Sequence, residues 1–136
     1  MIDHHSALIY TMVLVSAADM DMTDAELHVI GEIVSFLPVF RDYDKSKLTT
    51  TLSQCAELVA KEDGLEESLA AIKAALPTRL RETAYALACD VVAVDGEASQ
   101  EELRLLELIR HRLSVDRLIA AAIERGARAR FMKAAS

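Results

Sequence analysis

The feature that most constrains the fold is an internal repeat, because the chain matches itself when it is shifted by 76 residues. Residues 19–27 (DMDMTDAEL) align with residues 95–103 (DGEASQEEL). The register continues on both sides through the pairs Val15/Val91, Ala17/Ala93, Ile30/Leu106, Ile33/Ile109 and Leu37/Leu113. Such self-similarity indicates a supersecondary unit that is used twice. We therefore expect two helix-turn-helix units, each with an apolar helix, an acidic turn and an amphipathic helix.

Helical patterns recur along the whole chain, and no convincing strand alternation competes with them. Seven helices are expected, at about residues 4–19, 24–37, 45–61, 64–76, 79–93, 100–113 and 115–132. The first and fifth are apolar nearly all round and belong at the centre of a bundle. A chain of 136 residues has the length of one ordinary domain. The sequence thus predicts an all-α, single-domain bundle over residues 1–136, with two pseudo-symmetric units and central apolar helices.

Charge is distributed unevenly along the chain. The 22 acidic and 15 basic side chains give a formal charge of −7. Residues 1–109 carry 8 basic and 20 acidic side chains, whereas residues 110–136 carry 7 basic and 2 acidic ones. This balance disfavours a general nucleic-acid binder, because negative charge repels a phosphate backbone. The uncharged stretch 7–18 has no Lys or Arg before it and is too short to span a bilayer, which favours a cytoplasmic protein.

Part of the acidic turn chemistry has a purely structural explanation. Residues 23–26 (TDAE) and 99–102 (SQEE) are both capping boxes, in which a hydroxyl and a carboxylate satisfy free N–H groups at a helix start. Asp24 and Glu101 fall in first helical turns, where negative charge interacts favourably with the helix dipole. Helix initiation therefore accounts for these acidic residues without any ligand.

The remaining turn carboxylates follow the apolar helices in both units. They are Asp19, Asp21, Asp95 and Glu97. Packing of the units about a pseudo-twofold axis would bring the two turns together, and oxygen donors suit Ca²⁺ or Mg²⁺. This interpretation is a hard-cation site at those four residues. The alternative is a solvated acidic face for a protein partner, formed by Asp24, Glu26, Glu101 and Glu102.

The last predicted helix combines an apolar face with a basic end. The apolar face is formed by Val115, Leu118, Ile119, Ala122 and Ile123, after Ser114 as the expected cap. The basic end is formed by Arg125, Arg128, Arg130 and Lys133. Such an end docks on an acidic protein surface or on anionic lipid. In the alternative interpretation the cations suit the helix dipole and the apolar face covers the core.

The two turns carry a family resemblance. The pattern Ala-Ala-Asp-x-Asp-x-Thr-x-x-Glu-Leu, repeated as Ala-Val-Asp-Gly-Glu-Ala-Ser-x-x-Glu-Leu, resembles the TerB-like tellurite-resistance family over about residues 5–113. The second copy is the closer match, because Met20 replaces the usual Gly in the first. The resemblance implies an all-helical fold, an acidic cation-binding surface and a non-enzymatic role in bacterial tellurite resistance and stress response, with membrane and calcium-binding partners. It places the function on Asp19, Asp21, Glu26, Asp95, Glu97 and Glu102.

The histidines and the known catalytic motifs give little support for catalysis. His28 with Glu32, and Glu107 with His111, are spaced as exposed i,i+4 pairs. A di-metal carboxylate bundle needs Glu-x-x-His elements, and the sequence has none. It also lacks a phosphate loop and a nucleophile elbow. Two alternatives stay open: a di-metal carboxylate enzyme, and a scaffold held peripherally at the inner membrane face by the basic C-terminal helix.

Two further expectations concern side chains outside the repeat. Cys55 and Cys89 fall within apolar helical runs, where burial keeps a thiol inert. We therefore expect both to be free, buried thiols. His4 and His5 lie at a terminus that is expected to fray.

Overall fold

The computed structural model describes residues 1–18 and 22–135, which fold into helices and turns. The α-helices are α1 (His4–Ser16), α2 (Asp24–Phe36), α3 (Leu48–Ala60), α4 (Gly64–Ala75), α5 (Thr78–Ala93), α6 (Gln100–Arg112) and α7 (Arg117–Arg130). Two short 3₁₀ turns, η1 (Pro38–Phe40) and η2 (Lys45–Lys47), connect α2 to α3. The described residues contain seven α-helices and no strand, so the prediction of an all-α bundle is confirmed.

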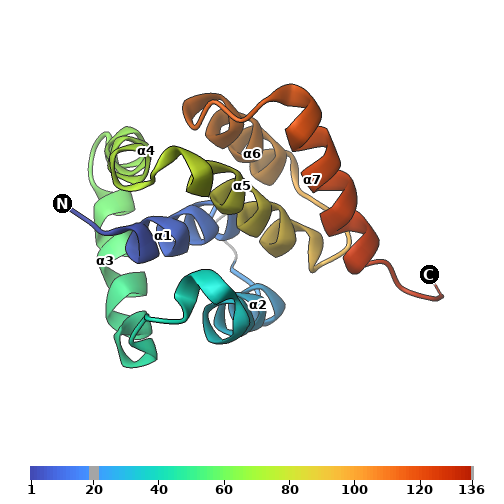
Figure 1. Cartoon of the computed structure of the whole chain (residues 1–136), viewed down its shortest axis with the longest axis horizontal. Helices are drawn as coiled ribbons and strands as arrows, with labels where there is room; N and C mark the ends of the chain where they lie inside the picture. Colours follow the sequence, from blue (N-terminus) through green and yellow to red (C-terminus); the bar gives the residue numbers. More distant parts are fainter. Residues whose placement is uncertain (19–21, 136) are drawn as a thin grey trace.

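Helices α1 and α5 lie side by side at the centre of the molecule (Figure 1). Most of α1 is buried, and Leu8, Ile9 and Met12 are fully enclosed. Helices α3 and α4 pack on α1, and α7 packs on α5. The predicted central position of the two apolar helices is therefore confirmed. All the buried apolar side chains belong to one core.

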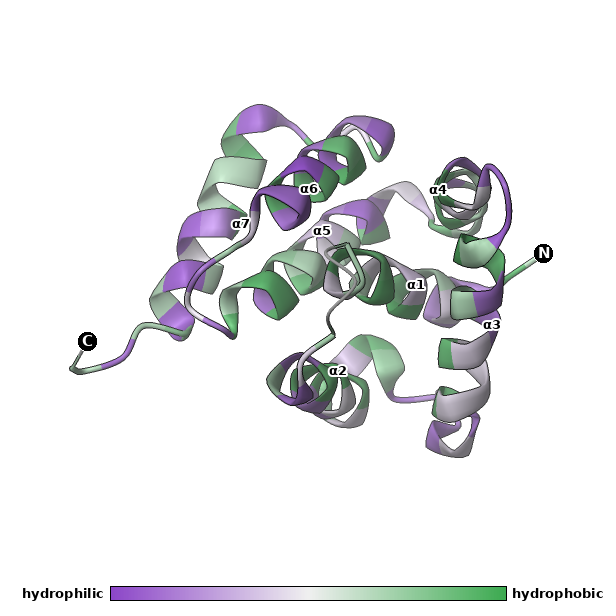
Figure 2. Ribbon diagram, turned by 180° about the vertical axis from the view of Figure 1, so that it is seen from behind, coloured by the Kyte–Doolittle hydropathy of each residue, from purple (hydrophilic) through white to green (hydrophobic). Residues whose placement is uncertain are grey.

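The repeat is visible in the helix bounds themselves. Helix α6 begins and ends 76 residues after α2 at both ends. Each amphipathic helix packs on both central helices, so α2 contacts α5 and α6 contacts α1. Hydrophobic residues line the inner side of these helices, whereas hydrophilic residues face outwards on α6 and α7 (Figure 2). This crossed packing is the pseudo-twofold arrangement that the sequence predicts.

The start of α7 differs from the prediction. The capping residue is Asp116, whose carboxylate accepts hydrogen bonds from the backbone N–H groups of Leu118 (3.0 Å) and Ile119 (3.3 Å). Ser114, the expected cap, instead adopts a left-handed backbone conformation with a φ of 57°. The prediction was wrong because Asp caps a helix as well as Ser does, and the Asp116 carboxylate accepts from two free N–H groups.

The face that α7 turns to the core also differs from the prediction. Leu118 is 80% exposed, whereas Ala120 and Ala127 are only 1% and 2% exposed. Small alanines therefore meet the core, and the large Leu118 faces solvent. The expected apolar face therefore covers the core only in part.

The connector between α2 and α3 closes over the start of α1. Phe40 is buried in the core, and its ring lies 5.5 Å from the ring of His5. The Nε2 atom of His5 is 2.8 Å from the backbone carbonyl oxygen of Val39. His5 is only 8% exposed, so the prediction that this terminus frays at His5 was wrong. The connector supplies the packing that holds the first turn of α1 in place.

Within the residues that the structure describes, no helix is both long and apolar enough to cross a membrane.

Candidate functional site at the paired acidic turns

Two capping boxes with matching geometry begin α2 and α6. The Thr23 hydroxyl accepts from the Glu26 backbone N–H at 3.1 Å, and the Glu26 carboxylate accepts from the Thr23 N–H at 2.9 Å. In the second unit, Ser99 and Glu102 make the same two bonds at the same two distances. The capping role predicted for these residues is confirmed. It also fixes where both carboxylates lie, because each must reach back to its own turn.

The two turns meet in the folded protein. The Thr23 hydroxyl donates to the Asp95 carboxylate, at 3.4 Å to Oδ1 and 3.3 Å to Oδ2, across 72 residues of sequence. Ser16, at the end of α1, donates to Oε1 of Glu26 at 3.2 Å. The predicted meeting of the acidic turns is therefore seen for the residues that the structure describes.

A hollow of about 360 Å³ opens at the place where the turns meet. Its polar lining is formed by Thr23, Glu26, Asp95, Glu97, Ser99 and Glu102. Four of these side chains are carboxylates and two are hydroxyls, so every side-chain polar atom facing the hollow is an oxygen. We call these six residues the acidic hollow.

The two glutamates of the acidic hollow are deeply buried. Glu26 is 2% exposed and Glu102 is 4% exposed. Burial first, and then the nearby carboxyl groups of Glu102 and Asp95, raise the pKa of Glu26 from 4.5 to about 7, against the opposing effect of the hydrogen bond from the Thr23 N–H. Negative charge is therefore costly at the base of the hollow, and a proton or a cation relieves it.

Only some of the acidic residues that the sequence predicts as site residues line the acidic hollow. Asp95 and Glu97 line the acidic hollow, whereas Asp19 and Asp21 lie outside the described residues. Asp24 and Glu101 are exposed on the first turns of their helices. Among the described residues, no group of three or more His, Cys, Asp or Glu side chains is already arranged to hold a metal ion.

Glu26 and Glu102 depart from the expected solvated partner face. Their carboxylates turn inward to the capping N–H groups, so their side chains are enclosed instead of displayed. In the sequence, helix capping is a sufficient explanation for both glutamates. It gives no reason to expect that their side chains lie close together in the fold. The one signal for it was their equivalence in the 76-residue repeat.

The four basic residues near the C-terminus also lie in different surroundings. Arg130 forms an ion pair with Asp90 on α5, which fastens the end of α7 to the central helix. Arg125 is exposed, and Arg128 and Lys133 line a separate groove beside α6. Only part of the predicted docking set is therefore free on the surface.

The histidine pairs and the cysteines lie away from the acidic hollow. His28 and Glu32 approach to 3.1 Å, and His111 and Glu107 to 3.9 Å, in exposed i,i+4 contacts as predicted. Cys55 and Cys89 are free and buried, and burial raises the pKa of each thiol to about 12. Their predicted burial is confirmed, and neither thiol is ionised near neutral pH.

Fold and site together define an all-helical protein of two repeated units whose acidic turns join at one hollow. The family model described as tellurite resistance protein TerB matches residues 5–125, nearly the whole chain. The chain belongs to the TerB family, and the resemblance seen in the acidic turns is confirmed. Comparison with the curated proteins and with the solved structures found no match.

Proposed function

We propose that this protein acts in tellurite resistance and related stress responses as a non-enzymatic, cation-dependent binding protein. The acidic hollow binds a divalent cation, Ca²⁺ or Mg²⁺, and the acidic surface around it binds a protein partner. The observation that carries the proposal is the convergence of four carboxylates from two turns 76 residues apart on one hollow.

The chemistry of the lining suits a hard cation. Ca²⁺ takes six to eight oxygen ligands at about 2.3–2.6 Å, and it accepts carboxylates, hydroxyls and water together. Because the described carboxylates are not already arranged to hold a metal, the ion keeps part of its hydration or draws the turns inward. Gly96, between Asp95 and Glu97, has a φ of 82° and so gives this turn a conformation that few other residues adopt.

The electrostatics favour cation binding in the same place. Burial first, and then the carboxyl groups of Glu102 and Asp95, raise the pKa of Glu26, so a negative charge at that position is poorly stabilised. A divalent cation offsets that charge and displaces the proton that Glu26 otherwise carries. We therefore expect cation binding to release protons, most strongly between about pH 6 and 7.

The surface around the hollow suits a basic partner. Asp24 and Glu101 stand exposed on the first turns of α2 and α6, one from each unit. Both helices begin at the hollow, so a partner that contacts these two side chains also senses the state of the site. A cation-dependent change in affinity for the partner is the expected behaviour.

A non-catalytic role is supported by what surrounds the reactive side chains. Both thiols are buried, His28 and His111 are paired at the surface, and His5 contacts a backbone carbonyl. Purified protein is expected not to retain iron or manganese; stoichiometric retention of either metal would favour the di-metal carboxylate enzyme.

Calorimetric titration with Ca²⁺ and Mg²⁺ tests the proposal. The variants Asp95→Asn and Glu97→Gln remove charge from the acidic hollow, and Asp24→Asn and Glu101→Gln make the same changes at exposed positions outside it. Cation affinity is expected to fall at least tenfold in the first pair and to stay within twofold in the second. Absence of binding heat in the unaltered protein, or equal losses in both pairs, would refute the cation site.

A further inference from the structure

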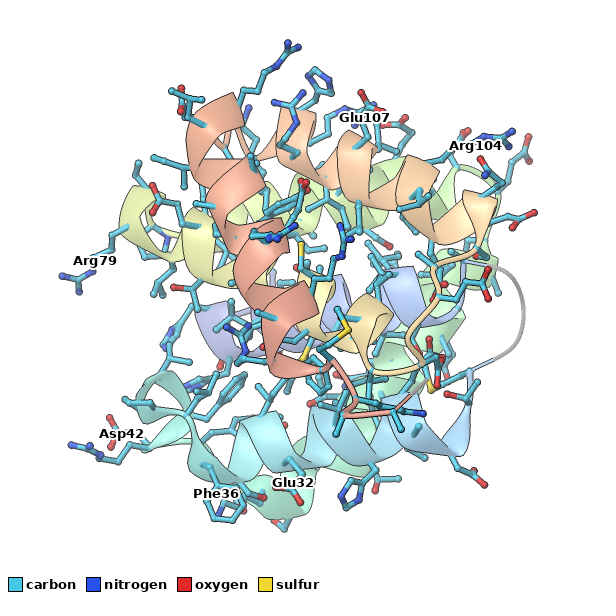
Figure 3. The ribbon with its side chains drawn as sticks, turned by 90° about the vertical axis from the view of Figure 1, so that its right-hand side faces the viewer. Glu32, Phe36, Asp42, Arg79, Arg104 and Glu107 are labelled. Carbon is cyan, nitrogen blue, oxygen red and sulfur yellow. The ribbon has the colours of Figure 1, made fainter. Side chains whose placement is uncertain are left out.

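A groove of about 910 Å³ lies between α6 and α7, away from the base of the acidic hollow. Both helices pack on α5, but they make little contact with each other, so α5 forms the floor of the groove. Figure 3 views the molecule from this side, with α7 and α6 in front of α5. Ligand sites in proteins commonly have volumes of about 300–1,000 Å³, and this groove falls within that range.

The floor of the groove is apolar, and its polar groups are satisfied. Cys89 and Val92 of α5, with Leu106 of α6, lie at the bottom and are nearly enclosed. The Tyr85 hydroxyl, also on the floor, donates to the Glu124 carboxylate at 2.5 Å. No floor group therefore demands a polar ligand, and an apolar chain can cover this surface without leaving a hydrogen bond unmade.

The groove is open because the two units have different connectors. In the first unit, residues 37–47 lie between α2 and α3 and insert Phe40 into the core. In the second unit, only residues 113–116 separate α6 from α7. Leu113 and Val115 are the buried side chains of that shorter connector. The second unit thus has no long connector to lie over its second and third helices.

Positive charge is gathered on the rim of the groove. Arg117, Arg128 and Lys133 line it, and none of the three is ion-paired with any residue that the structure describes. Arg128 lies in the last turn of α7 and Lys133 follows the helix, and this end of α7 lies beside the α5–α6 turn (Figure 1). In a chain with a formal charge of −7, two unpaired cations at one end of an apolar groove mark a place for an anionic group.

The acidic residues on the rim do not cancel this charge. Glu124 accepts from the Tyr85 hydroxyl but keeps its charge, and Glu107 is partly offset by His111. With Glu97, three carboxylates line the groove against four cations, which are Arg110, Arg117, Arg128 and Lys133. The lining therefore carries one net positive charge, and an anion is attracted to it.

We propose that this groove binds a single-chain amphipathic carboxylate of the fatty-acid type, with its head group at Arg128 and Lys133 and its chain along α5. The wall from Ala120 to Phe131 is about 16 Å long at 1.5 Å per helical residue, which suits an extended acyl chain. Alanines on this wall leave room for the chain. The groove shares Glu97 with the acidic hollow, but the variants that test laurate binding leave Glu97 unchanged.

Calorimetric titration of the full chain with laurate, below its critical micelle concentration, tests the proposal. Laurate is expected to bind with a stoichiometry of one. Shorter acids are expected to bind about fourfold more weakly for each methylene removed, which is the fold-change for about 0.8 kcal/mol per buried CH₂. Dodecyltrimethylammonium, with the same chain and the opposite charge, is expected to bind at least tenfold more weakly.

Matched variants locate the site. Ala121→Trp fills the groove from an exposed wall position, and Ala122→Trp makes the same change on α7 outside the groove. The first is expected to abolish laurate binding and the second to leave it unchanged. The double change Arg128→Gln with Lys133→Gln is expected to weaken laurate at least tenfold, whereas Arg125→Gln, at an exposed position outside the groove, has no effect.

Circular dichroism identifies any variant that fails to fold. In that case the series of shorter acids and the comparison of laurate with dodecyltrimethylammonium test the proposal on the unaltered protein. Absence of laurate binding, equal binding of the cationic amphiphile, or equal binding to Ala121→Trp overturns the proposal. Sedimentation that shows a dimer abolished by Ala121→Trp alone also overturns it, because a second copy of the chain then occupies the groove.

Discussion

Replacing Glu26 by Gln tests whether the buried glutamate pair destabilises the fold at neutral and alkaline pH. Burial first, and then the carboxyl groups of Glu102 and Asp95, raise the pKa of Glu26 from 4.5 to about 7. In the unfolded chain these causes disappear and the ordinary pKa returns. Between pH 4.5 and 7 the folded protein therefore binds more protons than the unfolded protein.

The size and sign of the effect follow from this difference. One pKa unit corresponds to about 1.4 kcal/mol, so raising a pKa from 4.5 to about 7 corresponds to about 3 kcal/mol. Because the folded state holds the extra proton, the contribution to stability is fully present below pH 4.5 and is lost as the pH rises to about 7. Above pH 7 this group leaves the free energy of unfolding about 3 kcal/mol below its value at acidic pH, where Glu26 is protonated in both states.

Urea unfolding followed by circular dichroism between pH 4.5 and 8.5 measures this loss. Gln keeps the side-chain oxygen that accepts from the Thr23 N–H, but it carries no charge. Glu26→Gln is therefore expected to lose this part of the pH dependence and to be up to about 3 kcal/mol more stable than the unaltered protein at pH 8. The two proteins are expected to agree within about 1 kcal/mol near pH 4.5, where both side chains are neutral.

Glu101→Gln is the matched control, because Glu101 lies one residue before Glu102 but is exposed. Its curve is expected to follow that of the unaltered protein within about 0.5 kcal/mol, as is usual for a surface substitution. If Glu26→Gln shows the same pH dependence as the unaltered protein, or is less stable at pH 8, burial of an unfavourable charge at Glu26 is refuted.

Three further predictions concern the core, the caps and the thiols. Phe40→Ala is expected to lower the free energy of unfolding by about 3–5 kcal/mol in urea titrations, because the ring is 1% exposed; a loss below 1 kcal/mol would mean that the connector does not pack there. Thr23→Ala is expected to cost about 1 kcal/mol and Thr23→Ser much less, since Ser keeps the hydroxyl that caps α2 and contacts Asp95; equal losses would assign the effect to the methyl group. Ellman's reagent is expected to label Cys55 and Cys89 at pH 8 only as fast as the protein opens, and labelling at the rate of free cysteine would contradict their burial.

Much of the fold could be predicted because the relevant signals are local. The capping boxes at residues 23–26 and 99–102 set the starts of α2 and α6 by hydrogen bonds within four residues. The uniform apolarity of α1 is enough to place it at the centre of a bundle. Repetition of both signals at one spacing also predicts that the two turns meet, because equivalent units tend to pack in equivalent ways.

The remaining features depend on long-range packing that no local pattern records. The side of α7 that faces the core depends on how the helix packs on α5, and this packing leaves Leu118 exposed. The burial of Glu26 and Glu102 depends on how closely the units approach. Each glutamate has a complete local explanation as a cap, so their equivalence in the 76-residue repeat is the one sequence signal of their contact.

The double use of Glu26 and Glu102 links the site to the fold. Each carboxylate holds the first turn of its helix through a capping bond to Thr23 or Ser99, and both also line the acidic hollow. Their mutual repulsion therefore acts directly on the starts of α2 and α6. A bound cation that offsets this repulsion tightens both helix starts together, because it leaves the two carboxylates ionised, the form that accepts most strongly from the capping N–H groups. On the proposed function, a partner that contacts these helix starts then distinguishes the loaded site from the empty one without touching the cation.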